Sequence, residues 1–384
     1  MELNQWSPGE SRKQVVKTDK YWIEYSNGFR HLDIQCGNAA YILGYNDQDV
    51  LDAIRNNEVN FLRGNSGESS ELNDQLVKLI CDRGNWAGLG YAVSGSDAVE
   101  AAVAMSDKYW ERLRIDKKKI ISFSQCYHGT TMLAKHLNGE YGYLNRATII
   151  PAPIWKYHLD QEETESTALS YVRTVLESDK EIGALIMETV PWVGTLRPYS
   201  KNWWQTIRSL CDEFKILMIV DDVAICWGKN GTLFGWESYG VQPDISALGK
   251  SLTGGYSPLG IAVCNKRVQT VLSKNSWEHS HTWSPNMAGV SAALATTKKV
   301  ESLLHRVNYI EQQLDNIAKE FNLNSRGAGL LRSFDVNKEM TLADLFQAGL
   351  VSAIKGHQSI KVIAPIIADE EYFETLRNSF KLLV

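Results

Sequence analysis

Short apolar runs alternate with helix-like segments along the middle of the chain, from about residue 88 to residue 264. A short apolar run with turn residues on either side predicts a buried strand. Seven such runs are present, at residues 89–93, 119–123, 147–151, 184–188, 216–220, 245–248 and 259–264. Because strands that alternate with helices form a parallel sheet covered on both faces, we expect an α/β fold around a mostly parallel seven-stranded sheet.

The two ends of the chain have other patterns. Residues 21–25 and 31–34 flank the turn sequence Ser26-Asn27-Gly28 and predict a β-hairpin. Further helices are predicted at residues 47–56, 69–83, 288–300, 307–321, 342–348 and 370–382, and further strands at 330–334 and 361–363. We therefore expect three parts, an N-terminal segment of residues 1–45, a large domain of residues 46–284 and a small α+β domain of residues 285–384.

Two of the predicted strands end in ionisable residues. The run at 216–220 is followed by Asp221 and Asp222, and the run at 245–248 is followed by Gly249 and Lys250. In a parallel sheet, ligands bind beyond the carboxyl ends of the strands, so an acid and an amine there converge on one pocket. Pyridoxal 5'-phosphate (PLP) requires this pair, because a lysine forms a Schiff base with its aldehyde and an aspartate keeps its ring nitrogen protonated.

The segment VDDVAICWGKNGTLFGWESYGVQPDISALGK, residues 220–250, resembles the signature of the class III aminotransferases, which are fold-type I PLP enzymes. The resemblance covers nearly the whole chain. It implies a large PLP-binding domain and a small domain to which the N-terminal segment contributes, beside the substrate entrance. It also implies that Asp221 holds the ring nitrogen, that Val223 packs on the ring face and that Lys250 is the Schiff-base lysine.

Two loops complete the expected cofactor site. The segment 93–100 joins a strand end to a helix start, whose backbone N–H groups suit a phosphate. It resembles the family's phosphate loop, which assigns Gly95 and Ser96 to the phosphate. Cys126-Tyr127-His128-Gly129 resembles the family's aromatic-His-Gly segment, which places Tyr127 over the ring, whereas His128 can be functional or structural.

Glu188 ends the strand at 184–188, where carboxylates of α/β sheets often serve sites. The resemblance implies a cofactor-side or arginine-pairing role, and the alternative is a turn glutamate paired with a nearby cation. The next residues, 189–192, depart from the Glu-Pro and Gly-rich sequence of the family. Trp155 and Trp192 fall in loops near the expected site and are candidates for the wall of the substrate pocket.

The segment 279–286, HSHTWSPN, precedes a predicted helix. His279 and His281 would bind a metal only with a third ligand, which the sequence does not indicate, so we predict no metal site. Thr282 resembles a family threonine that reaches the phosphate bound by the other subunit. This resemblance implies a homodimer whose active site is completed across a two-fold interface.

The chain departs from the family at three positions. Ala224 replaces a frequent glutamine, Lys229 replaces an arginine, and Val362 is in register with the arginine that binds the substrate carboxylate in amino-acid-specific members. Two subfamilies that lack that arginine are alternatives for this chain. Residues 6–12, together with residues 66–72, resemble glutamate-1-semialdehyde aminomutases, and this resemblance makes Arg12 a candidate for carboxylate binding, unless it is a solvated terminal residue. Other segments, at 98–110 and 252–256, resemble diaminopelargonate synthases and amine transaminases.

Composition narrows the classes of partner. Of the 384 residues, 40 are Lys or Arg and 45 are Asp or Glu, so the chain has no basic excess for nucleic acid or anionic membranes. No apolar run reaches the roughly 18 residues that span a bilayer. The six cysteines have no metal-ligand or disulfide spacing. We expect a cytoplasmic protein without nucleic-acid or membrane partners.

The expected function is a PLP-dependent aminotransferase that moves an amino group between an amine or amino acid and a keto or aldehyde acceptor. One alternative is an aminomutase that transfers the group within a glutamate-semialdehyde-like substrate. Another is a cofactor-binding relative that has lost turnover.

Overall fold

The computed structural model describes residues 13–63, 67–140, 144–153, 160–193, 196–274, 279–352 and 358–384. Two of the candidate substrate residues, Arg12 and Trp155, lie outside these ranges.

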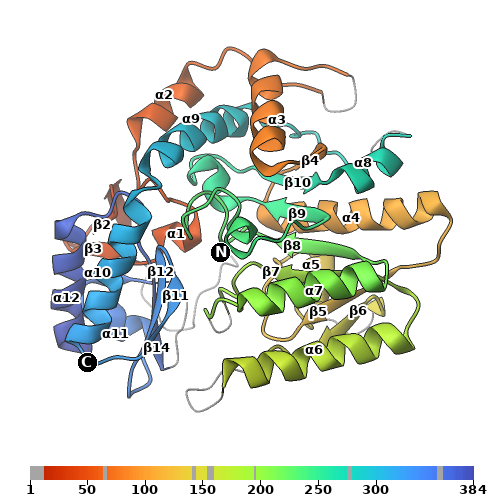
Figure 1. Cartoon of the computed structure of the whole chain (residues 1–384). Coiled ribbons are helices and arrows are strands. Elements are labelled where there is room, and N and C mark those ends of the chain that lie inside the picture. Colours follow the sequence, from red (N-terminus) through yellow and green to blue (C-terminus); the bar gives the residue numbers. More distant parts are fainter. Residues whose placement is uncertain are drawn as a thin grey trace.

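A seven-stranded sheet forms the centre of the protein (Figure 1). Its strands, in spatial order, are β4 (Gly88–Ala92), β10 (Gly260–Cys264), β9 (Ile245–Leu248), β8 (Leu217–Asp221), β7 (Ile182–Glu188), β5 (Lys119–Phe123) and β6 (Ala147–Ile150). The strands from β9 to β6 pair in parallel, and β10 is antiparallel to both of its neighbours. The predicted mostly parallel sheet is confirmed, with strand bounds close to those expected.

Helices cover both faces of this sheet and surround the rest of the chain. They are α1 (Cys36–Ala39), α2 (Gln48–Arg55), α3 (Glu71–Gly84), α4 (Gly95–Leu113), α5 (Met132–Leu137), α6 (Gln161–Ser178), α7 (Lys201–Glu213), α8 (Lys266–Leu272), α9 (Met287–Leu303), α10 (Arg306–Glu320), α11 (Leu342–Gln347) and α12 (Glu370–Leu383), with 3₁₀ turns η2 (Gly235–Tyr239) and η3 (Lys250–Thr253). Helix α4 lies with α5 and α8 on one face, and α6 lies beside α7 on the other.

The residues of β8 show why its apolar run is continuous. Leu217 and Ile219 belong to the core under α4, whereas Met218 and Val220 belong to the core under α7. Because successive side chains of a strand point to opposite faces, a strand covered on both sides needs apolar residues at every position. The same alternation puts Asp221, the last residue of β8, on the α4 face.

Both ends of the chain contribute to one four-stranded sheet. It contains β1 (Val15–Asp19), β2 (Trp22–Tyr25), β3 (Arg30–Asp33) and the two-residue strand β13 (Leu350–Val351), which pairs in parallel with β3. A three-stranded sheet of β11 (Ser325–Ala328), β12 (Leu331–Asp335) and β14 (Ser359–Ile363) lies nearby with α10 and α12 (Figure 1). The joining of the two termini, expected from the resemblance, is confirmed, while the domain boundaries stay a prediction.

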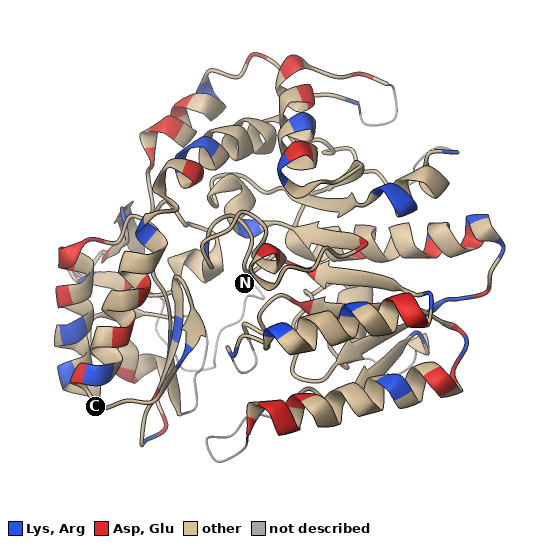
Figure 2. Ribbon diagram, viewed as in Figure 1, with Lys and Arg blue, Asp and Glu red and all other residues tan. Residues whose placement is uncertain are grey.

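The surface carries both signs of charge. Acidic and basic residues are interspersed along the outer helices (Figure 2). Within the described ranges, no helix combines the length and the apolar character that crossing a membrane requires.

Candidate active site

The ends of three neighbouring strands bring the central ionisable residues together. Glu188 of β7 lies opposite Asp221 of β8 in the strand register, and Asp221 lies opposite Ala247 of β9. Lys250 follows Ala247 by three residues and begins η3. These side chains meet at one cavity of about 150 Å³, which is lined by Ser94, Gly95, Ser96, Tyr127, His128, Gly129, Glu188, Trp192, Asp221, Val223, Ala224 and Lys250. The geometry therefore gathers eight of the predicted site residues.

Asp221 is held in a fixed orientation inside the protein. Its Oδ2 lies 2.8 Å from Nδ1 of His128, and its Oδ1 accepts a hydrogen bond of 3.1 Å from the backbone N–H of Val223. Burial opposes the charge on His128, but Cys126 and the hydrogen bond with Asp221 raise the pKa of His128 well above its usual range. Sequence reasoning did not assign His128 to the site, because nothing in a Tyr-His-Gly loop indicates which distant carboxylate it meets.

Asp222, the adjacent carboxylate, faces away from the cavity. Its Oδ1 accepts a hydrogen bond of 2.6 Å from Thr189 Oγ1, and its Oδ2 accepts one of 2.8 Å from the N–H of Gly235. Burial raises the pKa of Asp222 to about 7. Asp222 thus holds the segment after β7 to the turn before η2, and of the two adjacent aspartates Asp221 is the one available to a ligand in the cavity.

Lys250 is buried beside two carboxylates. Burial lowers the pKa of the Lys250 amine, and the charges of Asp221 and Glu188 oppose this effect. Its backbone has φ of +46°, in the left-handed region that residues with a Cβ rarely adopt. Strain of this kind costs about 1–3 kcal/mol and persists where surrounding packing imposes it, which is common at functional sites.

Glu188 links the two loops on the other side of the cavity. Its Oε2 accepts a hydrogen bond of 3.0 Å from the N–H of Tyr127, and its Oε1 accepts one of 3.3 Å from the N–H of Trp192. Burial raises the pKa of Glu188 to about 7, although His128 opposes this shift. Glu188 therefore positions both the expected ring-stacking residue and the tryptophan of the pocket wall.

The N-terminus of α4 forms another wall of the cavity. The side chain of Ser94 caps this helix by accepting a hydrogen bond of 3.2 Å from the N–H of Asp97. Ser96 Oγ accepts a hydrogen bond of 3.1 Å from the N–H of Thr130, which joins the two loops that were expected to hold the cofactor. The backbone N–H groups and the dipole of this helix favour a phosphate here.

Gly95→Ala is expected to weaken PLP binding by about tenfold, as an overpacking cost of about 1–3 kcal/mol implies. A Cβ at Gly95 would lie 2.6 Å from Cγ1 of Val223 and would push that side chain into the cavity. The measurement is a titration of the cofactor-free protein with PLP. Gly88→Ala is the control, because its nearest contact is the flexible side chain of Gln269 at 3.3 Å. An unchanged PLP affinity in Gly95→Ala would contradict this contact.

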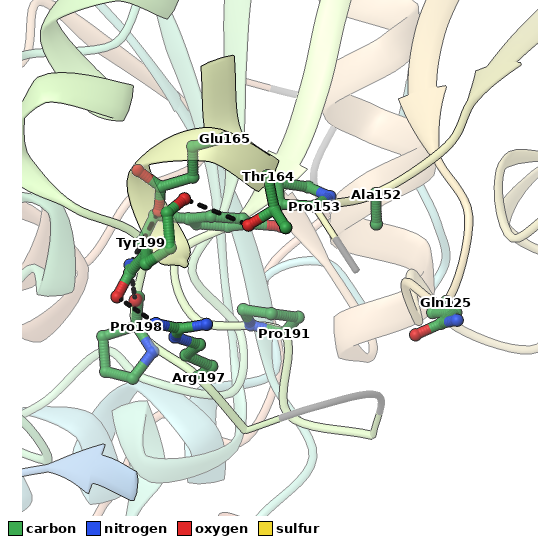
Figure 3. Close-up of a pocket in the computed structure, with 10 residues that line it drawn as sticks. Gln125, Ala152, Pro153, Thr164, Glu165, Pro191, Arg197, Pro198 and Tyr199 are labelled. Carbon is green, nitrogen blue, oxygen red and sulfur yellow. Dashed lines mark hydrogen bonds between the residues drawn. The ribbon is translucent and has the colours of Figure 1, made fainter. Parts of the chain in front are cut away.

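A second cavity, of about 20 Å³, lies behind the loop that carries Trp192. Figure 3 shows it with Gln125 on one side and Glu165, Arg197 and Tyr199 on the other. A cavity of this size holds about one water molecule, so it is part of the wall and is too small for a substrate.

The remaining candidates lie outside the cavity. Thr282 is exposed in the segment before α9 and is not among the residues that line the cavity of its own chain. In β14, Val362 packs in the main core, whereas Lys361 points toward the site and donates a hydrogen bond of 2.8 Å to the carbonyl of Val193. Lys361, and not Val362, is therefore the residue of this strand whose side chain lies beside Trp192 and Val193.

The residues around the cavity fit PLP. The amine of Lys250, the carboxylate of Asp221 and the helix start at Gly95 are the three groups that its aldehyde, ring nitrogen and phosphate require. His128 also lines the cavity, and within the described residues no group hydrogen-bonds its buried Nε2. The amine, the carboxylate and the backbone N–H groups of the helix start together suit a polar aromatic ligand with an anionic end.

Comparisons with known proteins agree with this geometry. The family described as Aminotransferase class-III matches residues 7–384. The chain is 28% identical to gamma aminobutyrate transaminase 3 of Solanum lycopersicum, over 86% of this chain and 70% of the relative. It is 27% identical to putrescine aminotransferase of Pectobacterium atrosepticum, over 90% of this chain and 76% of the relative.

Solved structures share the fold. An amine transaminase from an uncultivated Pseudomonas species, with PLP bound, superposes with a TM-score of 0.88 at 22% identity, over 100% of this chain and 98% of the other. The omega transaminase of Pseudomonas jessenii in complex with PMP gives a TM-score of 0.91 at 21% identity, over 99% and 95%. With the family match, the expected fold, enzyme class and cofactor are confirmed. The chain belongs to the class III aminotransferases.

Proposed function

We propose that this PLP-dependent aminotransferase uses Lys250 to bond the cofactor and Asp221 to hold the proton of its ring nitrogen. The observation that carries the proposal is that both side chains and the start of α4 line a single cavity of about 150 Å³. Bound PLP supplies an aldehyde for a lysine amine and a ring that takes up electrons from the substrate.

Each residue has a distinct task. Asp221, buried and oriented by His128 and the N–H of Val223, presents a negative charge to the ring nitrogen. Burial lowers the pKa of Lys250, against the charges of Asp221 and Glu188, which favours its action as the general base toward the substrate carbon that bears the amino group. Gly95 and Ser96 hold the phosphate, Tyr127 stacks on one face of the ring, and Val223 packs on the other.

The site is tested by a screen of amino donors against the purified holoenzyme, in which the visible absorbance of PLP reports reaction with each amine. Restoration of that absorbance by a separate keto acid supports intermolecular transfer. An aminomutase would need no added keto acid, and a relative without turnover would respond to no amine. The aminomutase resemblance rests on residues 6–12, which lie outside the described residues, and on residues 66–72.

We also propose that the substrate carries a carboxylate. Three basic residues, Arg197, Arg326 and Lys361, interact electrostatically, and Lys361 hydrogen-bonds the carbonyls of Trp192 and Val193 beside the cavity. Burial and, to a smaller extent, the charge of Arg326 lower the pKa of Lys361 to about 8, and burial and the charge of Arg197 lower the pKa of Arg326 to about 10. The positive charges therefore repel one another, although Arg326 is also paired with Asp335. An anionic group of a substrate reduces this repulsion, and Lys361 is the nearest of the three to Glu188 and the cavity.

A pH dependence follows from Lys361. Burial, assisted by Arg326, lowers the pKa of Lys361 to about 8, so the cation is present below this pH and is lost as the pH rises through it. The KM for a carboxylate-bearing acceptor is expected to rise about tenfold between pH about 7 and about 9. Lys361→Arg keeps its charge throughout this range, so its KM should stay nearly constant. An equal rise in both proteins would assign the titration to another group.

The active site is further proposed to be shared in a homodimer. Thr282 is exposed in its own chain, and its neighbour Trp283 has 67% of its surface exposed and contacts the ring of Phe61. Exposed aromatic residues of this kind favour a protein interface. Thr282 is then free to reach the phosphate of the partner subunit.

The six cysteines are free thiols, which supports a reducing compartment such as the cytoplasm.

A further inference from the structure

Asp97, His279 and His281 form a cluster beside the phosphate loop, although Asp97 lies 182 and 184 residues before the two histidines. Asp97 belongs to the first turn of α4, and the histidines belong to the segment that leads to Thr282 and α9. We propose that these three side chains bind a divalent transition-metal ion such as Zn²⁺. The sequence alone argued against a metal for want of a third ligand, and the fold supplies one.

The separations of the ligand atoms suit a tetrahedral ion. Ligands about 2.0–2.1 Å from Zn²⁺ lie roughly 3.3 Å from one another at tetrahedral angles. Oδ1 of Asp97 is 3.2 Å from Nε2 of His279 and 3.0 Å from Nε2 of His281, and all three ligand atoms lie within 4.8 Å of one another. The two imidazole rings are nearly perpendicular, at 85°, so they approach the carboxylate from different directions.

The chemistry of the ligands points to the same class of ion. Two imidazoles and a carboxylate are a common set for Zn²⁺, and three protein ligands leave a position for water. The backbone N–H of Val93 donates a hydrogen bond of 2.8 Å to Oδ2 of Asp97, which fixes the carboxylate in the way that outer ligands of metal sites do. Asp97 is buried while both histidines are partly exposed, which gives an ion access from solvent.

The ion has a structural consequence for the active site. It joins the start of α4, which carries Gly95 and Ser96, to the segment that carries Thr282. Both segments were assigned to the phosphate, one within the chain and one toward the partner subunit. Removal of the metal is therefore expected to make the holoenzyme lose PLP faster on dialysis.

A purely structural cluster, in which both imidazoles donate hydrogen bonds to Asp97, would have the same distances. The two cases differ in which substitutions of His281 preserve the binding of zinc. Glutamine retains an N–H donor toward Asp97 but is a poor ligand for Zn²⁺, whereas glutamate has the same reach, is a ligand for Zn²⁺ and has no N–H to donate. A metal site therefore accepts glutamate and rejects glutamine.

The experiment uses the tag-free holoenzyme, treated with a chelator, equilibrated with Zn²⁺, and analysed for bound zinc by mass spectrometry after gel filtration. We expect one ion per chain in the wild-type protein and in His281→Glu, and at least about 100-fold weaker binding in His281→Gln and Asp97→Asn. His305→Ala, at an exposed histidine before α10, is the control and should bind zinc normally. Absence of zinc from the wild-type protein, or normal binding by His281→Gln, would overturn the proposal.

Discussion

Lys250→Ala is expected to lower the turnover of amino transfer by at least about 10³-fold, because one amine serves both as the bond to PLP and as the general acid and base. Among the cavity-lining residues that the structure describes, Lys250 is the single lysine. Turnover is measured with the donor that the screen identifies. Borohydride reduction followed by peptide mass spectrometry should label Lys250 with the cofactor in the wild-type protein and leave the variant unlabelled.

Two controls separate loss of this amine from general damage. Lys266→Ala removes an exposed lysine at the start of α8, so its turnover and cofactor labelling should match the wild type. A small added amine such as methylamine should restore part of the activity of Lys250→Ala, since it can occupy the vacated space and move the proton. Wild-type turnover together with covalent cofactor in Lys250→Ala would refute the assignment.

The meeting of Asp221 and Lys250 could be predicted from the sequence because parallel strands end at the same edge of a sheet. The apolar runs before both residues are continuous, as strands covered on two faces must be. Which of the two adjacent aspartates faces the cavity depends on the face of the sheet. The alternation along β8 decides this question for Asp221, which shares the face of Leu217 and Ile219.

Other features depend on contacts that the sequence does not encode locally. A run of apolar residues has no direction, so the antiparallel pairing of β10 could not be derived from it. The two-residue strand β13 is too short to give a pattern, and β1 carries the exposed residues Val15 and Val16. The contact of His128 with Asp221 joins residues 93 positions apart.

The position of Lys361 shows how sensitive such reasoning is to register. A shift of one residue along a strand exchanges its two faces. The resemblance to the family placed Val362 in register with the carboxylate-binding arginine, but the side chain of Val362 packs in the core. The neighbouring strand confirms the assignment of faces, because Leu331 and Ile363, which are paired, lie in the small core beside Trp192. The position of Lys361, which we propose to bind a substrate carboxylate, therefore had to come from the structure.

Asp221→Asn is expected to lower turnover by about 10²- to 10⁴-fold, which corresponds to the loss of about 3–5 kcal/mol when one partner of a buried charge pair is removed. The amide has nearly the same shape but cannot hold the proton of the ring nitrogen as an anion does. It also weakens the interaction with His128, so the absorbance of the bound cofactor should change together with the turnover.

Asp222→Asn is the matched control for this substitution, because Asp222 is the next residue, is equally buried and lies outside the cavity. Its hydrogen bonds with Thr189 and Gly235 hold two turns together, so the variant should lower the melting temperature of the protein. The turnover of the fraction that remains folded should stay within about threefold of the wild type, since the carboxylate toward the ring is unchanged. If Asp222→Asn lost more turnover than Asp221→Asn at equal stability, the ring-nitrogen role would belong to Asp222, and the geometry of the strand end described above would be wrong.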